Sequence, residues 1–210
     1  MKKELNLSKQ NEQFILEMKK QDPIFFSNLS QGQSPEYFVL ACSDSRVSPS
    51  ITANMPLGHF FVHRNVANQV VESDDSFSAG LYYALKHLQI KKIIIEGHTN
   101  CGGIDAACKT RQQYGQKQEL DQKSKDSQTA EEGIMTWISE IQKNLHVQQQ
   151  CKDLTNFELV KLNVLNQIEN VKEHPVYKKY GESVEISGYV FDLSSGKLIE
   201  VAAPNPEAFN

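Results

Sequence analysis

The stretch Glu36-Tyr-Phe-Val-Leu-Ala-Cys-Ser-Asp-Ser-Arg46 decides how the rest of the chain is interpreted. Its first six residues are mostly apolar, as in a buried strand, and Val47-Ser-Pro49 after it breaks regular structure. The thiol of Cys42, the carboxylate of Asp44 and the guanidinium of Arg46 therefore follow the end of a predicted strand. Open α/β sheets bind their ligands at this end of their strands.

A second apolar run ends in groups that complement the first. Ile93-Ile-Ile95 precedes Gly97-His-Thr-Asn-Cys-Gly-Gly103, and the glycines of that segment permit a tight turn. Two cysteines, one histidine and one aspartate thus follow the ends of two candidate neighbouring strands. Thiolates and an imidazole in a tetrahedral ligand set favour Zn²⁺. From the residues alone, Asp44 can either bind the metal as a fourth ligand or pair with Arg46.

Composition limits the classes of protein to consider. A chain of 210 residues, 39% of them hydrophobic, predicts a single domain with one core. The net charge of −4 gives no electrostatic reason for a nucleic-acid partner. No apolar run approaches the ~20 residues that span a bilayer, and the first residues lack the features of a secretory or transit signal. We therefore expect a cytoplasmic protein with neither a nucleic-acid nor a membrane partner.

The four cysteines fit that compartment best as thiols. In a reducing environment they are expected to be free, metal-bound or buried rather than disulfide-bonded. Cys108 and Cys151 belong to neither strand-end cluster. We expect both to be structural residues, because free cysteine commonly behaves as a small buried hydrophobe.

The periodicity of the chain predicts an α/β fold. Strands are expected at residues 36–41, 59–64, 91–96, 183–192 and 197–201, and helices at residues 8–20, 73–88 and 155–174. Ser73 is the expected N-cap of the second helix, and Thr155 with Glu158 forms a capping box for the third. The alternation of strands and helices predicts a mostly parallel central sheet flanked by helices.

Two segments stand apart from this sheet. Residues 1–31 are expected to form an N-terminal helical arm. Residues 109–132 are too polar to pack much core, which predicts a polar insertion that forms a solvated loop or an irregular helix.

Three motifs, in this order, resemble those of the β-class carbonic anhydrases. They are Cys42-Ser-Asp-Ser-Arg46, Phe61-Val-His-Arg-Asn-Val-Ala-Asn68 and Gly97-His-Thr-Asn-Cys-Gly-Gly103. Asn163 and Gln167 add to the likeness, which extends from about Asn11 to Leu198 and is weakest in the polar insertion.

The resemblance implies an α/β fold, an obligate homodimer that often pairs into a tetramer or larger assembly, and a zinc ion. Cys42, His98 and Cys101 would bind the zinc, and Asp44 and Arg46 would form a catalytic dyad. The substrate would contact five further residues, some of them supplied by the dimer partner: Gln33, Phe61, Val66, Tyr83 and Gly102.

The implied activity is the zinc-dependent, reversible hydration of carbon dioxide to bicarbonate and a proton, by attack of zinc-bound hydroxide. Two alternatives stay open. One is a carbonyl sulfide or carbon disulfide hydrolase on the same scaffold, since those linear, apolar substrates would suit the same nucleophile. The other is a non-enzymatic, zinc-stabilised module with Asp44 as a permanent ligand, although such a closed site would need neither Arg46 nor Gln33.

Overall fold

A computed structural model describes residues 6–114, 130–145 and 154–202 of the chain. It divides into two units, residues 1–34 and 35–210, and each is described by itself. The first unit contains α1 (Leu7–Gln21) and α2 (Phe25–Leu29). The side chain of Asn6 caps α1 by accepting a hydrogen bond from the amide of Lys9 at 3.0 Å. The helix expected at residues 8–20 is confirmed.

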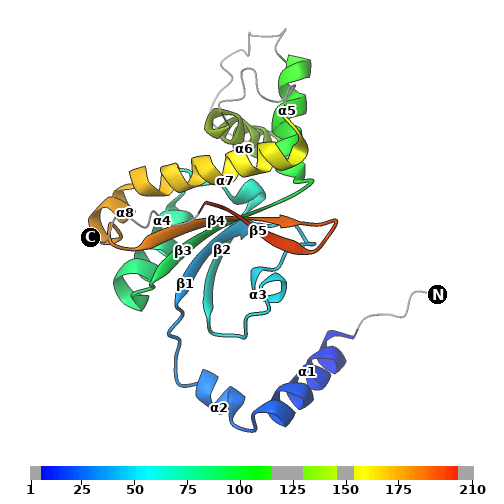
Figure 1. Cartoon of the computed structure of the whole chain (residues 1–210), viewed down its shortest axis with the longest axis vertical. Helices are drawn as coiled ribbons and strands as arrows, with labels where there is room; N and C mark the ends of the chain where they lie inside the picture. The colour runs from blue at the N-terminus through cyan, green and yellow to red at the C-terminus, as the bar shows by residue number, and fades with distance from the viewer. Residues whose placement is uncertain (1–5, 115–129, 146–153, 203–210) are drawn as a thin grey trace, which may run out of the picture. The chain divides into compact units, whose positions relative to one another are not determined.

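The second unit is built on one sheet of five strands. In chain order the strands are β1 (Tyr37–Cys42), β2 (Phe60–Asn65), β3 (Lys92–His98), β4 (Glu185–Asp192) and β5 (Lys197–Ala202). Their order across the sheet is β2-β1-β3-β4-β5, so β2 and β5 form the edges. The first four strands are parallel and β5 is antiparallel to β4. The expected mostly parallel central sheet is thus confirmed. Figure 1 shows this sheet and the helices that flank it.

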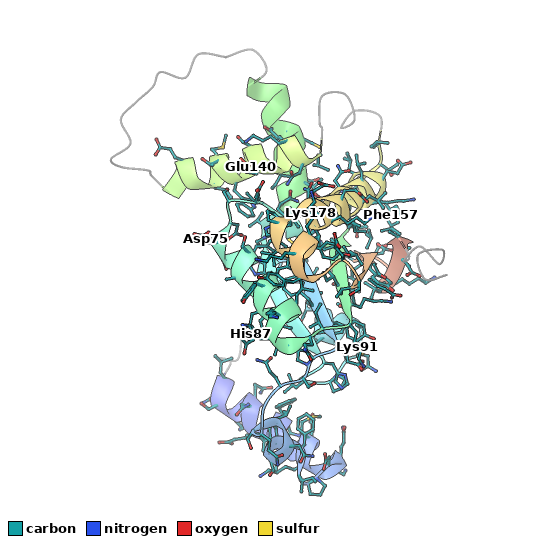
Figure 2. The ribbon with its side chains drawn as sticks, turned by 90° about the vertical axis from the view of Figure 1, so that its left-hand side faces the viewer. Asp75, His87, Lys91, Glu140, Phe157 and Lys178 are labelled. Atoms are coloured by element: carbon teal, nitrogen blue, oxygen red, sulfur yellow. The ribbon has the colours of Figure 1, made fainter. Side chains whose placement is uncertain are left out.

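Helices connect and cover these strands. They are α3 (Pro49–Thr52), the single turn η1 (Val66–Asn68), α4 (Asp75–Tyr82), α5 (Gly102–Tyr114), α6 (Ala130–Asn144), α7 (Asn156–Glu173) and α8 (Pro175–Tyr180). A π-helical turn, η2 (Tyr83–Leu88), continues α4, and Asp75 and His87 mark the two ends of this combined helix in Figure 2. Among the described helices, none combines the length and apolar character needed to cross a membrane.

One of the two predicted helix N-caps is confirmed and the other is wrong. The capping box of Thr155 and Glu158 is present at the start of α7, as predicted. Ser73 is not the N-cap of α4: Asp74 is, and its carboxylate accepts hydrogen bonds from the amides of Ser76 at 2.9 Å and Phe77 at 3.3 Å. A carboxylate at this position also interacts favourably with the positive end of the helix dipole, an advantage that a serine hydroxyl lacks.

The expected polar insertion is helical at both of its ends. Helix α5 continues to Tyr114 and α6 begins at Ala130, and the two helices pack side by side (Figure 1). The middle of the segment, residues 115–129, lies outside the described residues.

Close packing of α7 against the sheet depends on two glycines. A Cβ atom on Gly97 of β3 would lie 2.8 Å from one methyl group of Val164, and a Cβ atom on Gly188 of β4 would lie 2.7 Å from the other. Val164 is fully buried and fills the space above both strands. Because the χ1 angle of valine is restricted in a helix, Val164 cannot turn away to admit a larger residue.

Gly188→Ala is therefore expected to lower the free energy of unfolding by about 1–3 kcal/mol, the usual cost of overpacking a core. Gly133→Ala is the matched control, since Gly133 lies in α6 and a Cβ there would meet no heavy atom within 4 Å. That change should be stabilising by about 0.5–1 kcal/mol, because alanine is the better helix former. Denaturant unfolding of both variants measures the difference. Equal effects of the two changes would contradict the packing argument.

Candidate metal centre

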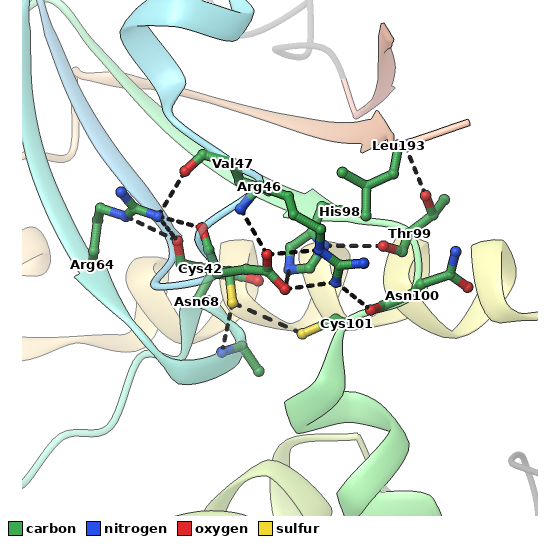
Figure 3. Close-up of polar contacts among 12 residues, drawn as sticks. Cys42, Arg46, Val47, Arg64, Asn68, His98, Thr99, Asn100, Cys101 and Leu193 are labelled. Carbon is green, nitrogen blue, oxygen red and sulfur yellow. Dashed lines mark hydrogen bonds and ion pairs between the residues drawn. The ribbon is translucent and has the colours of Figure 1, made fainter. Parts of the chain in front are cut away.

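The pairing of β1 with β3 brings three ligand atoms together. The two strands are parallel neighbours, so Cys42 at the end of β1 and His98 at the end of β3 lie at the same edge of the sheet. Cys101 follows in the turn before α5. The sulfur atoms of Cys42 and Cys101 are 3.9 Å apart, and one ligand atom from each of the three residues lies within 4.8 Å of the others (Figure 3). The structure thus brings together the three residues that the two strand-end motifs offer as metal ligands.

The imidazole of His98 is oriented for a metal ion. Its side chain is fully buried, and its Nδ1 lies 3.0 Å from the carbonyl oxygen of Thr99, to which it can donate. The other nitrogen, Nε2, makes no hydrogen bond to any described residue. A buried polar atom without a partner is costly, and a cation beside Nε2 and the two sulfurs would remove that cost. The donor set therefore fits a metal ion of the kind that thiolates and imidazole bind.

The two thiols favour one negative charge and resist a second. The neighbouring Cys101 thiol lowers the pKa of Cys42, and the amide of Ala67, which donates to Cys42 Sγ at 3.3 Å, lowers it further. The same pairing, with burial, raises the pKa of Cys101. A bound cation would allow both sulfurs to ionise, because it compensates the second charge.

Asp44 is paired with Arg46 in this structure. The guanidinium donates from Nε to Oδ1 at 2.9 Å and from Nη2 to Oδ2 at 2.7 Å, and the Arg46 amide donates to Oδ1 at 2.9 Å. This bidentate pair lowers the pKa of Asp44 well below its usual range. Oδ2 nevertheless lies 3.8 Å from Nε2 of His98, so the carboxylate borders the metal site without leaving its arginine.

A second arginine, Arg64, fixes the loop that carries Asp44. It lies on β2 and donates to the carbonyl oxygens of Cys42 at 2.7 Å, Asp44 at 2.8 Å and Val47 at 2.7 Å (Figure 3). Arg64 lies within the second of the three motifs, which by itself indicates no role for it. The acceptors of Arg64 are main-chain groups, which the sequence does not mark. Only the position of Arg64 on the strand next to Cys42 could have predicted these contacts.

The expected substrate residues are not all near the metal ligands. Val66 is 37% exposed, and its side chain packs against Gly103, two residues after Cys101. Gly102 is exposed, and a Cβ there would meet no heavy atom within 4 Å, so the space beside this residue is open. Gln33 belongs to the other unit, residues 1–34, so this site is described without it.

Phe61 and Tyr83 form a separate aromatic pair, with ring centroids 5.8 Å apart. Phe61 lies four residues before Asn65, which is the partner of Cys42 in the sheet. At ~3.3 Å per residue this places Phe61 about 13 Å along the strand from the metal end. Within one chain, the structure therefore does not bring these two rings to the metal ligands.

Of the remaining cysteines, Cys108 is not part of the cluster. Cys108 is partly buried and packs against the core, in keeping with a structural role. It is disulfide-bonded, however, so the expectation of a reduced thiol is wrong for this residue. Cys151 lies outside the described residues.

Comparison with known proteins points to one family. Residues 37–198 match the sequence profile of the family described as carbonic anhydrase. A carbonic anhydrase of Emericella nidulans is 34% identical over 198 residues, which cover 90% of this chain and 78% of the relative.

Solved structures agree with the sequence comparison. A β-carbonic anhydrase of Coccomyxa, solved with acetazolamide, superposes with a TM-score of 0.78 at 28% identity, over 98% of this chain and 89% of that one. One of two tetrameric β-carbonic anhydrases of Sordaria macrospora gives a TM-score of 0.77 at 26% identity, over 94% of this chain and 95% of that one. The expected α/β architecture and the expected family are both confirmed, and the chain belongs to the β-carbonic anhydrase family of enzymes.

Proposed function

We propose that this chain catalyses the zinc-dependent, reversible hydration of carbon dioxide to bicarbonate and a proton. The observation that carries the proposal is the state of Asp44. Both of its oxygens are bound by Arg46, while three other ligand atoms converge beside it. Three protein ligands leave a metal position free for chemistry, whereas four would close the site. This arrangement supports an enzyme over a zinc-stabilised structural module.

Each side chain has a role in this proposal. Cys42, His98 and Cys101 would hold the zinc, which when bound supplies Lewis-acid activation of a water molecule. Asp44 would accept a hydrogen bond from that nucleophile through the oxygen that faces His98, and so turn a lone pair toward the carbon of the substrate. Arg46 would hold Asp44 in this position. Val66 and the open space at Gly102 would border the approaching carbon dioxide.

We also propose that the working enzyme is a homodimer or a larger symmetric assembly. Strand β2 is an edge of the sheet and carries Val62, which is 38% exposed. The Phe61–Tyr83 pair lies too far from the metal ligands of its own chain to line their substrate pocket. It could line only the pocket of a second copy. The related Sordaria macrospora enzymes are tetrameric. A cytoplasmic location stays a prediction from the sequence.

Hydration activity of the zinc-loaded protein should rise from pH 6 to pH 9. Two thiolates cancel the charge of Zn²⁺, so the water activated there is expected to be a weaker acid than at an all-histidine site, where its pKa is about 7. Asp44 should add no step to this profile, because Arg46 keeps its pKa low and the carboxyl ionised throughout this range. Stopped-flow hydration of carbon dioxide measures the profile, and no detectable turnover at any pH would overturn the proposed function.

Arg46→Ala should retain one zinc per chain and lose activity by about 100-fold or more, the scale of loss that follows a misplaced catalytic group. Arg46→Lys should restore little, because an ammonium group cannot bind both carboxylate oxygens. Cys101→Ala is the contrasting variant, since it removes a ligand and should lose the metal itself. Zinc content and turnover are measured on the same samples. Near-normal turnover in Arg46→Ala would refute the dyad.

Val62→Glu should convert the assembly to monomers and abolish most activity, because a charge on the exposed edge strand opposes pairing with a second copy. Ile134→Glu is the matched control: Ile134 is 44% exposed on α6 and should tolerate the charge. Sedimentation velocity gives the mass of each variant. A wild-type protein that is monomeric and fully active would contradict the proposed assembly.

A further inference from the structure

Ala67 holds an unusual backbone conformation beside the metal ligands. It is fully buried in η1 with φ 64° and ψ 25°, in the left-handed region, and its amide donates to the sulfur of Cys42 at 3.3 Å. Residues with a Cβ atom rarely adopt this conformation, and it persists only where the surrounding structure fixes it.

Two carboxamides hold the carbonyl group of Ala67. Gln69 Nε2 donates to this oxygen at 2.6 Å and Asn163 Nδ2 donates to it at 3.1 Å, so two donors converge on a single acceptor. Gln69 Nε2 also donates to Asn163 Oδ1 at 2.8 Å, which ties the two side chains together. These two residues thus orient the peptide group that follows Ala67. The preceding peptide group, which carries the Ala67 amide, is bound from its other side by Trp137, whose Nε1 donates to the carbonyl oxygen of Val66 at 2.9 Å.

Gln167 fixes this pair to α7. Its Nε2 donates to Gln69 Oε1 at 3.1 Å, and its Oε1 accepts a hydrogen bond from the amide of Val70 at 2.7 Å. Gln69, Asn163 and Gln167 are at most 1% exposed, so water does not compete for these bonds. Buried networks whose members are paired in this way are rigid, and they transmit position from one element to another.

We propose that Asn163, acting with Gln69, is a positioning residue of the metal centre: it holds the Ala67 amide on the sulfur of Cys42. A hydrogen bond from an amide stabilises the thiolate, which is the form of Cys42 that binds a metal, and by withdrawing charge from the sulfur it would keep that metal electrophilic. This matters in a site whose two thiolates already cancel the charge of Zn²⁺. This proposal rests on the proposed zinc site. It adds Asn163 of α7 as a residue that supports a metal ligand without contacting the metal.

The wild-type protein tests the hydrogen bond directly. With ¹¹³Cd in place of zinc, a proton–cadmium correlation spectrum should show the Ala67 amide proton coupled to the metal through the sulfur of Cys42. Cross-peaks from the Cβ protons of Cys42 and Cys101 report independently that the metal is bound. If those peaks appear and the Ala67 peak is absent, the proposal is overturned while the metal site stands.

Variants test the role of Asn163. Asn163→Leu, or the smaller change Asn163→Ser, should weaken zinc binding about 10- to 100-fold in competition with a chelator, the usual effect of losing an outer-shell partner. Either change should also shift the sulfur-to-metal charge-transfer band of the Co²⁺-substituted protein. Asn170→Ala is the matched control, because Asn170 lies on the same helix and donates to Gln167 at 3.3 Å but does not contact Ala67.

A purely structural role predicts a different pattern. In that case Asn163 and Asn170 variants would lower the midpoint of thermal unfolding while zinc affinity and the Co²⁺ band of the folded protein stayed as in the wild type. That result would overturn the proposal. If neither Asn163 variant folds, Gln69→Met, which removes the other donor to the Ala67 carbonyl oxygen, is measured in its place, with the same two outcomes.

Discussion

The parallel hydrogen-bonded pairing of β1 with β3 is the constraint on which the site depends. It sends the carboxyl ends of both strands to the same edge of the sheet, so Cys42 and His98 meet although 55 residues separate their strand ends. Helix α7 packs closely over this sheet because Gly97 and Gly188 leave room for Val164. The same helix then carries Asn163 and Gln167 to the turn beside Cys42. Packing of the core and positioning of the site are therefore linked through one helix.

Two arginines next to the site bind different kinds of acceptor. Arg46, whose side chain is half exposed, binds the carboxylate of Asp44 and keeps it ionised at the border of the metal site. Arg64 binds three main-chain carbonyl oxygens and so fixes the loop from Cys42 to Val47 without taking the carboxylate away. Arg46 adds a second anchor, because its Nη2 also donates to the carbonyl oxygen of Asn100 at 3.1 Å. Both arginines thus contribute to the position of Asp44.

Within a single chain, the cluster of Cys42, His98 and Cys101 lies at the carboxyl ends of the strands, whereas Phe61, which pairs with Tyr83, lies near the amino end of β2. The distance between them follows from the rise of a strand and cannot be closed by rotating side chains. An enzyme that uses both groups in one pocket must take them from two copies of the chain. Assembly would then be a condition of activity, and the free edge of β2 is the surface that our proposed dimer would use.

The sequence by itself indicated the cluster of Cys42, His98 and Cys101, the five strands, and the capping box of Thr155 and Glu158, because these depend on residue type and short spacing. It left the partner of Asp44 undecided, since a carboxylate two residues from both Cys42 and Arg46 can reach either. It placed the cap of α4 one residue early, because serine and aspartate are both good N-caps. Only the tertiary structure revealed the contacts of Arg64, Ala67 and Asn163. Their partners are main-chain atoms or residues far along the chain. The sequence does not show which side chain will bind a given backbone carbonyl or amide, because every residue carries these groups.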